Sequence, residues 1–333
     1  MSDFTDYVRS LPKAELHLHI EGTLEPELLM RLVQKHRVEI PYQSIADIKR
    51  AYQFDDLQSF LDLYYLGASV LIEEEDFYIL MFAYLQRCLL EGIVHTEMMF
   101  DPQTHTDRGI DFSVFMSGFK RAIDQAQREW GMSCFLIMCF LRHLTQESAF
   151  DTLDAAMAYK DQIIAVGLDS AESGNPPEKF AAVFQTAMKQ GYRLVAHAGE
   201  EGPPAYIWSA LDSLGVARID HGVRCLDDAV LVQRLVDQRT PLTVCPLSNV
   251  RLCVFTNMSE HPILAMLDRG LNVSVNSDDP SYFGGYLLDN LTALHEALGL
   301  TEAQADQLAV NSFEGSFLDA SIKASWIAQI SSP

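Results

Sequence analysis

The segment Ala14–Gly22, AELHLHIEG, places two histidines in an apolar run and follows them with a glutamate and a glycine. Side chains on a β-strand alternate between the two faces, so His17 and His19 would point the same way. Two imidazoles on one face can chelate a transition metal. Histidines in such a pattern also occur as a hydrogen-bonded polar patch, so the rest of the chain has to decide between the two interpretations.

Eight apolar runs recur along the chain, with helical patterns between them. We expect strands at Glu15–His19, Ile93–Phe100, Cys134–Leu141, Ile163–Ser170, Arg193–His197, Ala217–Asp220, Pro241–Cys245 and Leu271–Asn276. Helical apolar spacing occupies Pro177–Gln190, Ala205–Leu214, Asp227–Gln238 and Pro262–Arg269. Repeated strand–helix units indicate a parallel sheet. Eight units predict an α/β fold, a (β/α)8 barrel of the TIM type, with a doubly wound open sheet as the main alternative.

One connection is much longer than the others. Residues 23–92, between the first two strands, contain three segments with helical periodicity. We interpret them as an additional helical layer over one end of the barrel, within a single domain that spans residues 1–333. The chain is expected to be helical beyond Thr301, and residues 330–333, ISSP, to form a loose tail.

Composition excludes several classes of partner. The net charge is −22, from 46 acidic and 24 basic residues, so the surface repels nucleic acid and anionic membranes. No run of 18 apolar residues is present, which argues against a membrane span. The first residues lack the pattern of a secretory signal, and the six cysteines include no C-x-x-C pair. These features predict a cytoplasmic protein with reduced thiols.

Polar residues gather at the carboxyl ends of four predicted strands. After AELHLHIEG come VAHAGEEG with His197 and Glu200, RIDHG with His221, and VNSDDP with Asp278 and Asp279. Active sites of (β/α)8 barrels lie at this end of the strands. The four segments are therefore expected to meet at one mouth.

This convergence favours the metal interpretation. Three histidines and one carboxylate suit zinc with a position left for water, and we assign His17, His19, His197 and Asp278 as ligands. Barrels with two metals often use a modified lysine at the end of the fourth strand. The sequence there is VGLDSAESG, without lysine, so one Zn²⁺ per chain is expected.

The remaining polar residues are then candidates for chemistry. Glu200 lies near His197 in sequence and is a natural proton carrier, while His221 can orient the nucleophile and Asp279 can face the substrate. Asp220 is interpreted as a structural partner. Glu97 is expected in the barrel interior, where a structural role and a site role stay equally open.

Five motifs in this order resemble those of the adenosine and adenine deaminases of the amidohydrolase superfamily: PKAELHLHIEG, VAHAGEEG, RIDHGVR, VCPLSN and VNSDDP. They span Pro12 to Pro280. The resemblance implies a (β/α)8 barrel, one zinc and hydrolytic removal of the amino group from C6 of a purine. It implies that Glu200 protonates N1, that His221 orients the hydroxide and that Asp279 contacts N7. The implied metal ligands are His17, His19, His197 and Asp278.

Two departures from the family pattern concern the substrate. The nucleoside enzymes have an aspartate that contacts the sugar, where this chain has the longer Glu21. Near the place where those enzymes have a glycine beside N3, this chain has Glu172. A carboxylate there can accept a hydrogen bond from the ring N–H of a free base, and such a site rejects analogues lacking that group. Both changes favour adenine as the substrate, converted to hypoxanthine and ammonia in purine salvage.

Other functions stay open at this point. Adenosine or an N6-substituted adenine would use the same mechanism. A purine-binding or regulatory barrel without activity is a further alternative, although such proteins usually lose a ligand or the glutamate. The expected partner is a small purine, and the protein is a possible homo-oligomer.

Overall fold

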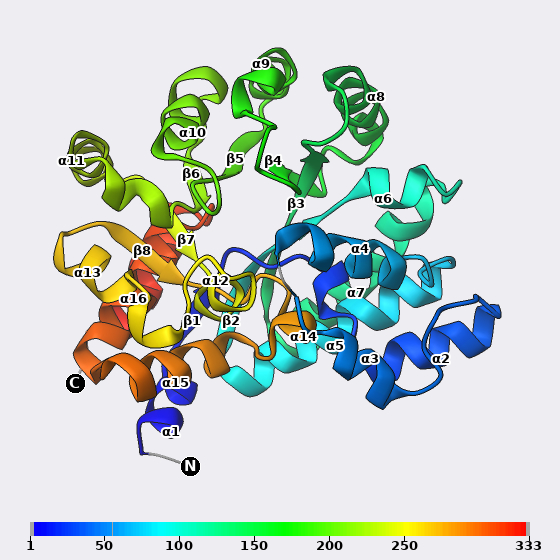
Figure 1. The fold of residues 1–333 in the computed structure, drawn as a ribbon, viewed down its shortest axis with the longest axis horizontal. Coiled ribbons are helices and arrows are strands. Elements are labelled where there is room, and N and C mark those ends of the chain that lie inside the picture. The colour runs from blue at the N-terminus through cyan, green and yellow to red at the C-terminus, as the bar shows by residue number, and fades with distance from the viewer. Residues whose placement is uncertain (1–2, 55, 331–333) are drawn as a thin grey trace.

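The computed structural model describes residues 3–54 and 56–330, and it confirms the (β/α)8 barrel (Figure 1). All eight strands are parallel and pair in sequence order. They are β1 Lys13–Glu15, β2 Ile93–Phe100, β3 Ser133–Leu141, β4 Ile163–Asp169, β5 Arg193–Ala198, β6 Arg218–His221, β7 Pro241–Val244 and β8 Asn272–Val275. The segments after β1 and β8 meet through a bridge between Leu18 and Asp278.

The first strand is displaced from its expected place. It ends at Glu15, so His17 and His19 lie beyond it and not within Glu15–His19 as the sequence pattern suggested. The ladder with β2 is irregular at Lys13, and the chain then continues extended, with His19 bridged to Met99. Side chains still alternate between two faces along this extension, so His17 and His19 point to the same side and both reach the carboxyl end of the barrel.

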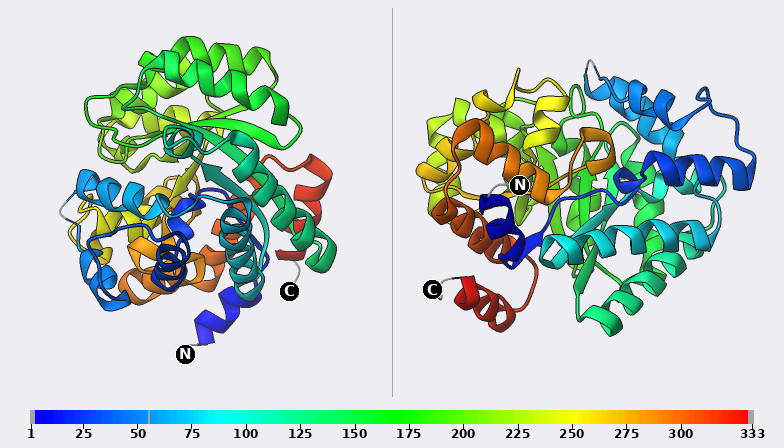
Figure 2. Two further views of the ribbon diagram at one scale, coloured as in Figure 1. Left: turned by 90° about the vertical axis from the view of Figure 1, so that its right-hand side faces the viewer. Right: turned by 90° about the horizontal axis from the view of Figure 1, so that it is seen from below.

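Helices surround the sheet, and Figure 2 shows this ring from two further sides. Those outside the long connection are α1 Asp3–Ser10, α6 Pro102–Thr106, α7 Phe112–Trp130, α8 Gln146–Ala156, α9 Ala181–Lys189, α10 Pro204–Ser209, α11 Ala229–Gln238, α12 Pro246–Arg251, α13 Ile263–Asp268, α14 Pro280–Phe283, α15 Leu287–Leu298, α16 Glu302–Gly315 and α17 Ala320–Ile330. Short helical turns are η2 Met157–Tyr159, η3 Pro177–Phe180, η4 Ala210–Leu214, η5 Val223–Asp227 and η6 Met258–Glu260. Residues 331–333 of the expected tail lie outside the described residues.

The connection between β1 and β2 is helical, as predicted. It comprises η1 Glu21–Thr23, α2 Pro26–His36, α3 Ile45–Ala51, α4 Leu57–Ala68 and α5 Glu74–Glu91. The long helix α5 packs against α7 and so belongs to the outer ring of the barrel. Helix α4 begins with a capping box, in which Asp56 and Ser59 satisfy one another's backbone N–H groups. It lies over the carboxyl end of the strands (Figure 1).

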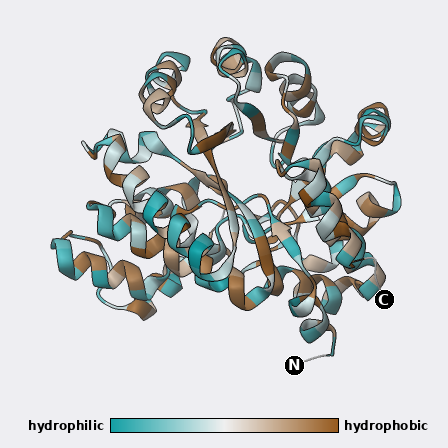
Figure 3. Ribbon diagram, turned by 180° about the vertical axis from the view of Figure 1, so that it is seen from behind, coloured by the Kyte–Doolittle hydropathy of each residue, from teal (hydrophilic) through white to brown (hydrophobic). Residues whose placement is uncertain are grey.

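Apolar residues of the strands and of the inner helix faces form the main core, and Figure 3 shows hydrophobic and hydrophilic residues interspersed along the outer helices. No helix among residues 3–54 and 56–330 is both long and apolar enough to cross a membrane. All six cysteines are free thiols.

A buried ion pair sits inside the barrel, away from the mouth. Arg218 donates to Glu97 at 2.6 Å and to the Leu16 carbonyl at 2.9 Å, and Glu97 also accepts from the Phe317 N–H. Both charged side chains are fully buried. Glu97, which the sequence left between two roles, therefore joins β2 to β6 and to the segment after α16.

We predict that Glu97→Ala lowers the free energy of unfolding by about 3–5 kcal/mol, because the Arg218 charge would stay buried without its main partner. Urea unfolding measures this difference. Asp124→Ala, which removes the exposed partner of Lys120, is the control and should change stability little. Equal effects of the two substitutions would contradict the structural role of the buried pair.

Candidate active site

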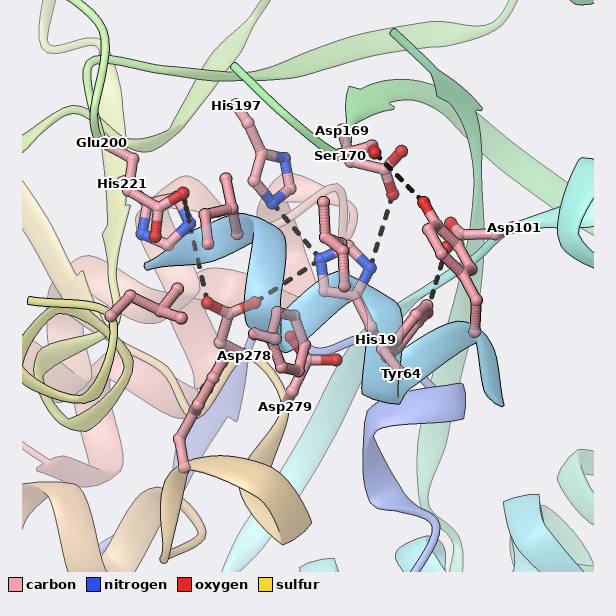
Figure 4. A pocket seen from close by; sticks show the side chains of 16 residues that line it. His19, Tyr64, Asp101, Asp169, Ser170, His197, Glu200, His221, Asp278 and Asp279 are labelled. Atoms are coloured by element: carbon pink, nitrogen blue, oxygen red, sulfur yellow. Dashed lines mark hydrogen bonds and ion pairs between the residues drawn. The ribbon is translucent and has the colours of Figure 1, made fainter. Parts of the chain in front are cut away.

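A pocket lies at the carboxyl ends of the strands, where the sequence pattern had placed its polar residues (Figure 4). At one end of it lie His197, Glu200, His221 and Asp278. At the other end lie Tyr64, Asp101, Asp169 and Ser170. His19 stands between the two groups, and apolar side chains of α4 cover the pocket.

Donor atoms of four residues converge beside this pocket. Nε2 of His17 and Nε2 of His19 lie 3.3 and 3.5 Å from Oδ1 of Asp278. Nε2 of His19 lies 3.2 Å from Nε2 of His197. Ligand atoms around a tetrahedral zinc lie about 3.3 Å apart, because each is about 2.0–2.1 Å from the ion. These three distances are short enough for atoms that share a metal ion. Donor atoms of His17, His197, His221 and Asp278 also lie within 4.8 Å of one another, so His221 belongs to the same cluster.

The protonation of these histidines also fits a metal. Nδ1 of His17 lies 3.2 Å from the Thr243 carbonyl oxygen, which can only accept, so the ring proton is on Nδ1. Nε2 of His17 is buried and has no hydrogen-bond partner among the described residues. Burial lowers the pKa of His17, but the Asp278 charge and hydrogen bond at this nitrogen outweigh it and raise the pKa above its usual value. Burial, together with the neighbouring histidines, lowers the pKa of His197 well below its usual range. Its ring is neutral, as a ligand must be.

His19 and Asp278 each contact a polar group on the side that faces away from the donor cluster. Nδ1 of His19 faces Oδ2 of Asp169 at 3.5 Å. Oδ2 of Asp278 accepts a hydrogen bond from the Ser248 hydroxyl at 2.6 Å, which leaves Oδ1 toward the histidines. Groups that hold the far side of a ligand fix its orientation and raise its affinity for metal.

Glu200 and His221 lie against each other beside the donor cluster. Oε2 of Glu200 is 3.6 Å from Nε2 of His221. Burial, and then the charges of Asp278 and Glu172, raise the pKa of Glu200 well above its usual range. A carboxyl group in this state keeps its proton at neutral pH and can act as an acid. Burial lowers the pKa of His221 to about 3, so its ring is neutral.

Glu172 does not face the pocket, contrary to our expectation. Its Oε1 accepts from the Gly199 N–H at 2.7 Å, and its Oε2 accepts from the N–H groups of Glu200, Glu201 and Gly202 at 3.0, 3.0 and 2.9 Å. A carboxylate has about four acceptor positions, and all are taken here. A count of positions after strand four could not show this direction, and the contact with a purine that we expected for Glu172 is withdrawn.

Glu21 is also directed away from the pocket. Its side chain is 1% exposed, and its carboxylate binds His105 Nε2 at 2.8 Å and the Asp101 N–H at 3.3 Å. The Tyr64 hydroxyl is 3.4 Å away. Glu21 therefore supports Asp101 and Tyr64 from below, because η1 turns its side chain under the mouth.

Asp279 lies in the pocket as the sequence suggested. It is 3% exposed, and its Oδ1 has no hydrogen-bond partner among the described residues. Burial and the neighbouring Asp278 charge raise its pKa well above the usual range. The Asp279 carboxylate also explains the glycine in AELHLHIEG, because a β-carbon on Gly22 would overlap it.

Sequence reasoning missed the acid pair at the far end of the pocket. Asp101 follows β2 and Asp169 ends β4, and no hydrogen-bond partner for Asp101 Oδ1 or either Asp169 oxygen occurs in the described structure. Burial and the adjacent Asp101 raise the pKa of Asp169 well above its usual range, so the pair holds a proton. Both aspartates end apolar strands, which is the signal that could have found them.

Three pocket residues have left-handed backbone angles, which are rare outside glycine. The φ angles are +71° at Ser170, +64° at His221 and +63° at Asp278. Such conformations are costly and cluster at functional sites. These three residues lie at the same end of the barrel as the donor cluster, which supports this end as the functional site.

The comparisons with known proteins agree with this geometry. The adenosine deaminase family model matches residues 12–333. An adenine deaminase of Acinetobacter baylyi is 57% identical over 326 residues, which cover 98% of each chain. The crystal structure of an adenine deaminase from Arthrobacter aurescens has a TM-score of 0.94 at 48% identity and covers 96% of this chain and 98% of its own.

A more distant solved structure, an amidohydrolase of Burkholderia ambifaria with bound Zn, is 24% identical, with a TM-score of 0.90 over 99% of this chain and 92% of its own. At that identity the likeness shows the fold alone. The family match covers nearly the whole chain and includes all the candidate donor residues. The chain therefore belongs to the adenosine deaminase family, and it is a hydrolytic deaminase.

Proposed function

We propose that this protein hydrolyses adenine to hypoxanthine and ammonia with one zinc ion, as a single-domain cytoplasmic enzyme of purine salvage. The observation that carries the proposal is the buried Glu200, whose pKa burial raises well above its usual range, beside the cluster of candidate metal donors. Relatives named adenine deaminase at 57% identity support the choice of substrate.

The metal would be held by His17, His19, His197 and Asp278. When bound there, zinc supplies a nucleophile by lowering the pKa of water to about 7. The chain's own residues then control the proton movements. We propose no second metal, since the segment at the end of strand four, VGLDSAESG, has no lysine that could be modified to bridge two ions.

Three side chains act on the purine in this proposal. Glu200 transfers its proton to N1 as oxygen adds to C6, so no ring anion forms. His221 donates a hydrogen bond to the attacking oxygen, and protonated Asp279 donates one to N7. Glu200 next takes a proton from the added oxygen and passes it to the amino group. The C6–N bond then breaks, and ammonia leaves with hypoxanthine as the second product.

Asp101 and Asp169 replace Glu172 as our explanation for a free base. Their unpartnered oxygens lie at the end of the pocket away from Glu200. A free purine carries an N–H on its five-membered ring, which an unpartnered oxygen can accept. A nucleoside has a sugar carbon there instead, so the buried acceptor would stay unpaired.

The pocket also disfavours nucleotides. Among the described residues that line it, none is lysine or arginine, whereas five are acidic: Asp101, Asp169, Glu200, Asp278 and Asp279. A phosphate group would meet acids and no positive partner. The net charge of −22 acts in the same direction.

The contacts of Glu172 assign it a positioning role for Glu200. Its four hydrogen bonds fix the backbone from Gly199 to Gly202, and its charge helps to keep Glu200 protonated. Arg142, fully buried, holds the same region by donating to the His197 carbonyl at 2.8 Å and to the Asn175 carbonyl. The acid and a metal donor are thereby held on one rigid segment.

His197→Ala should remove metal and deaminase activity together, because it deletes one of the four donors. Elemental analysis of the purified protein should show one zinc per chain before the change and little after it. His295→Ala is the control. His295 lies in α15, where its ring stacks on Phe4 of α1, and its substitution should leave the metal content unchanged. A native content near two metals per chain would contradict the single-ion proposal.

Native protein should prefer adenine over adenosine by about 10⁴-fold or more in kcat/KM, measured by ultraviolet absorbance of each purine. Asp101→Asn should lower kcat/KM for adenine at least about 10-fold, as expected for a lost hydrogen bond to a charged group. Asp62→Asn, on the exposed face of α4, is the matched control. Comparable native values for the two purines would defeat the free-base proposal.

Glu172→Gln should lower kcat by about 10²-fold, the typical effect of displacing a catalytic group by about 1 Å, while zinc content stays native. In a Glu200→Gln background the same change should have little further effect, since Glu172 acts through Glu200. Glu147→Gln, the same substitution at an exposed position of α8, is the control. Additive losses in the double variant would remove the positioning role.

A further inference from the structure

A line of hydrogen bonds runs from His221 away from the pocket. Nδ1 of His221 lies 3.2 Å from Nδ2 of Asn249 in α12. Oδ1 of Asn249 lies 3.2 Å from Nε2 of His261, and Nδ1 of His261 lies 3.3 Å from the backbone N of Ile263. Asn249 is fully buried, and His261 is 4% exposed. None of the roles described so far uses Asn249 or His261.

The line has only one self-consistent direction. The backbone N–H of Ile263 can only donate, so Nδ1 of His261 must be a bare acceptor. The single ring proton of His261 is then on Nε2 and is donated to Oδ1 of Asn249. The amide nitrogen of Asn249 consequently faces His221 and donates to its Nδ1. His221, as a neutral ring, must carry its proton on Nε2.

The protonation states required for this line agree with burial. Burial lowers the pKa of His261 to about 3, so its ring is neutral and carries one proton. Nδ1 of His221 accepts from Asn249 and is therefore bare, so that ring also carries one proton. A charged His261 would point an N–H at the N–H of Ile263, and the line would break.

We propose that Asn249 and His261 are positioning residues that hold His221 in the tautomer with hydrogen on Nε2. The proposal rests on the deaminase function above and deepens the part that His221 plays in it. Nε2 of His221 points into the site, 3.6 Å from Glu200 Oε2 and 3.7 Å from Asp278 Oδ2. With hydrogen on that atom, His221 donates to the attacking oxygen and is not the base that takes its proton.

The same tautomer decides which histidines bind the metal. Donor atoms of His221 lie close enough to those of His17, His197 and Asp278 to complete a four-ligand group. A ring nitrogen that carries hydrogen has no lone pair for an ion. His221 is thereby kept off the metal, and His19 supplies the remaining imidazole.

The direct test is nuclear magnetic resonance of zinc-loaded, full-length protein with ¹⁵N-labelled histidine. The chemical shifts of the ring nitrogens tell N–H from a bare nitrogen, and His221→Gln assigns the His221 signals. Native protein should show hydrogen on Nε2 of His221. Asn249→Asp offers a carboxylate that can only accept, so His221 should move its hydrogen to Nδ1.

Kinetics give the second readout. Asn249→Asp should lower kcat for adenine by about 10²-fold, the typical cost of one lost donor to the developing charge, with KM and zinc content close to native. Asn257→Asp, the same substitution at an exposed position before η6, is the matched control. His261→Gln keeps a donor for Asn249 and should keep the native tautomer. His261→Leu removes it and should give a mixture of tautomers.

Hydrogen on Nδ1 of His221 in the native protein would overturn the proposal, and so would unchanged hydrogen on Nε2 in Asn249→Asp. Circular dichroism reports whether each variant folds. If Asn249→Asp does not fold, the native spectrum and His261→Leu decide, and an unaltered tautomer in His261→Leu counts against the proposal. Failure of the adenine assay in native protein would refute the proposed function, whereas the tautomer measurement needs no turnover.

Discussion

A cluster of histidine and carboxylate donor atoms at the carboxyl ends of the strands is the feature on which this site depends. Oδ1 of Asp278 lies 3.3 Å from Nε2 of His17 and 3.5 Å from Nε2 of His19, and Nε2 of His19 lies 3.2 Å from Nε2 of His197. The hydrogen of His17 is held on the far side of its ring by Thr243. Such a cluster is electrostatically unfavourable without a cation at its centre. The metal ion proposed above accounts for the short distances and for the tautomer of His17.

Much of the surrounding chain holds these donors in place. The parallel strands bring their carboxyl ends to one mouth, and residues behind each strand end direct the side chains. Ser248 and Asn249 are neighbours in α12, yet one binds the ligand Asp278 and the other binds His221. Glu172 in turn holds the loop of Glu200. Glu200, His221 and the candidate metal ligand Asp278 are therefore positioned by buried hydrogen bonds, which are stronger than hydrogen bonds exposed to water.

The sequence predicted the barrel and the convergence of the polar strand ends, because strand periodicity and strand-end position are local properties of the chain. The direction of side chains in loops is not local. Glu172 and Glu21 were predicted to touch substrate from their place in a motif, and the structure turns both toward backbone or buried partners. Asp101 and Asp169 were missed because neither strand end carries a candidate metal ligand, and after β4 the prediction fell on Glu172 instead. The role of His261 depends on its contact with Asn249, and although Asn249 ends the motif VCPLSN, His261 lies outside all five motifs.

The central claim is that one metal, the acid Glu200 and a hydrogen-bond acceptor at the Asp101 and Asp169 end of the pocket act together on a free purine. A crystal structure of the zinc-loaded protein with hypoxanthine, with anomalous scattering measured at the zinc absorption edge, tests it most directly. We predict a single zinc bound to His17, His19, His197 and Asp278, the purine N1 against Glu200, and its five-membered ring toward Asp101 and Asp169. A second ion, zinc bound to His221, or a purine in the opposite orientation would contradict the account.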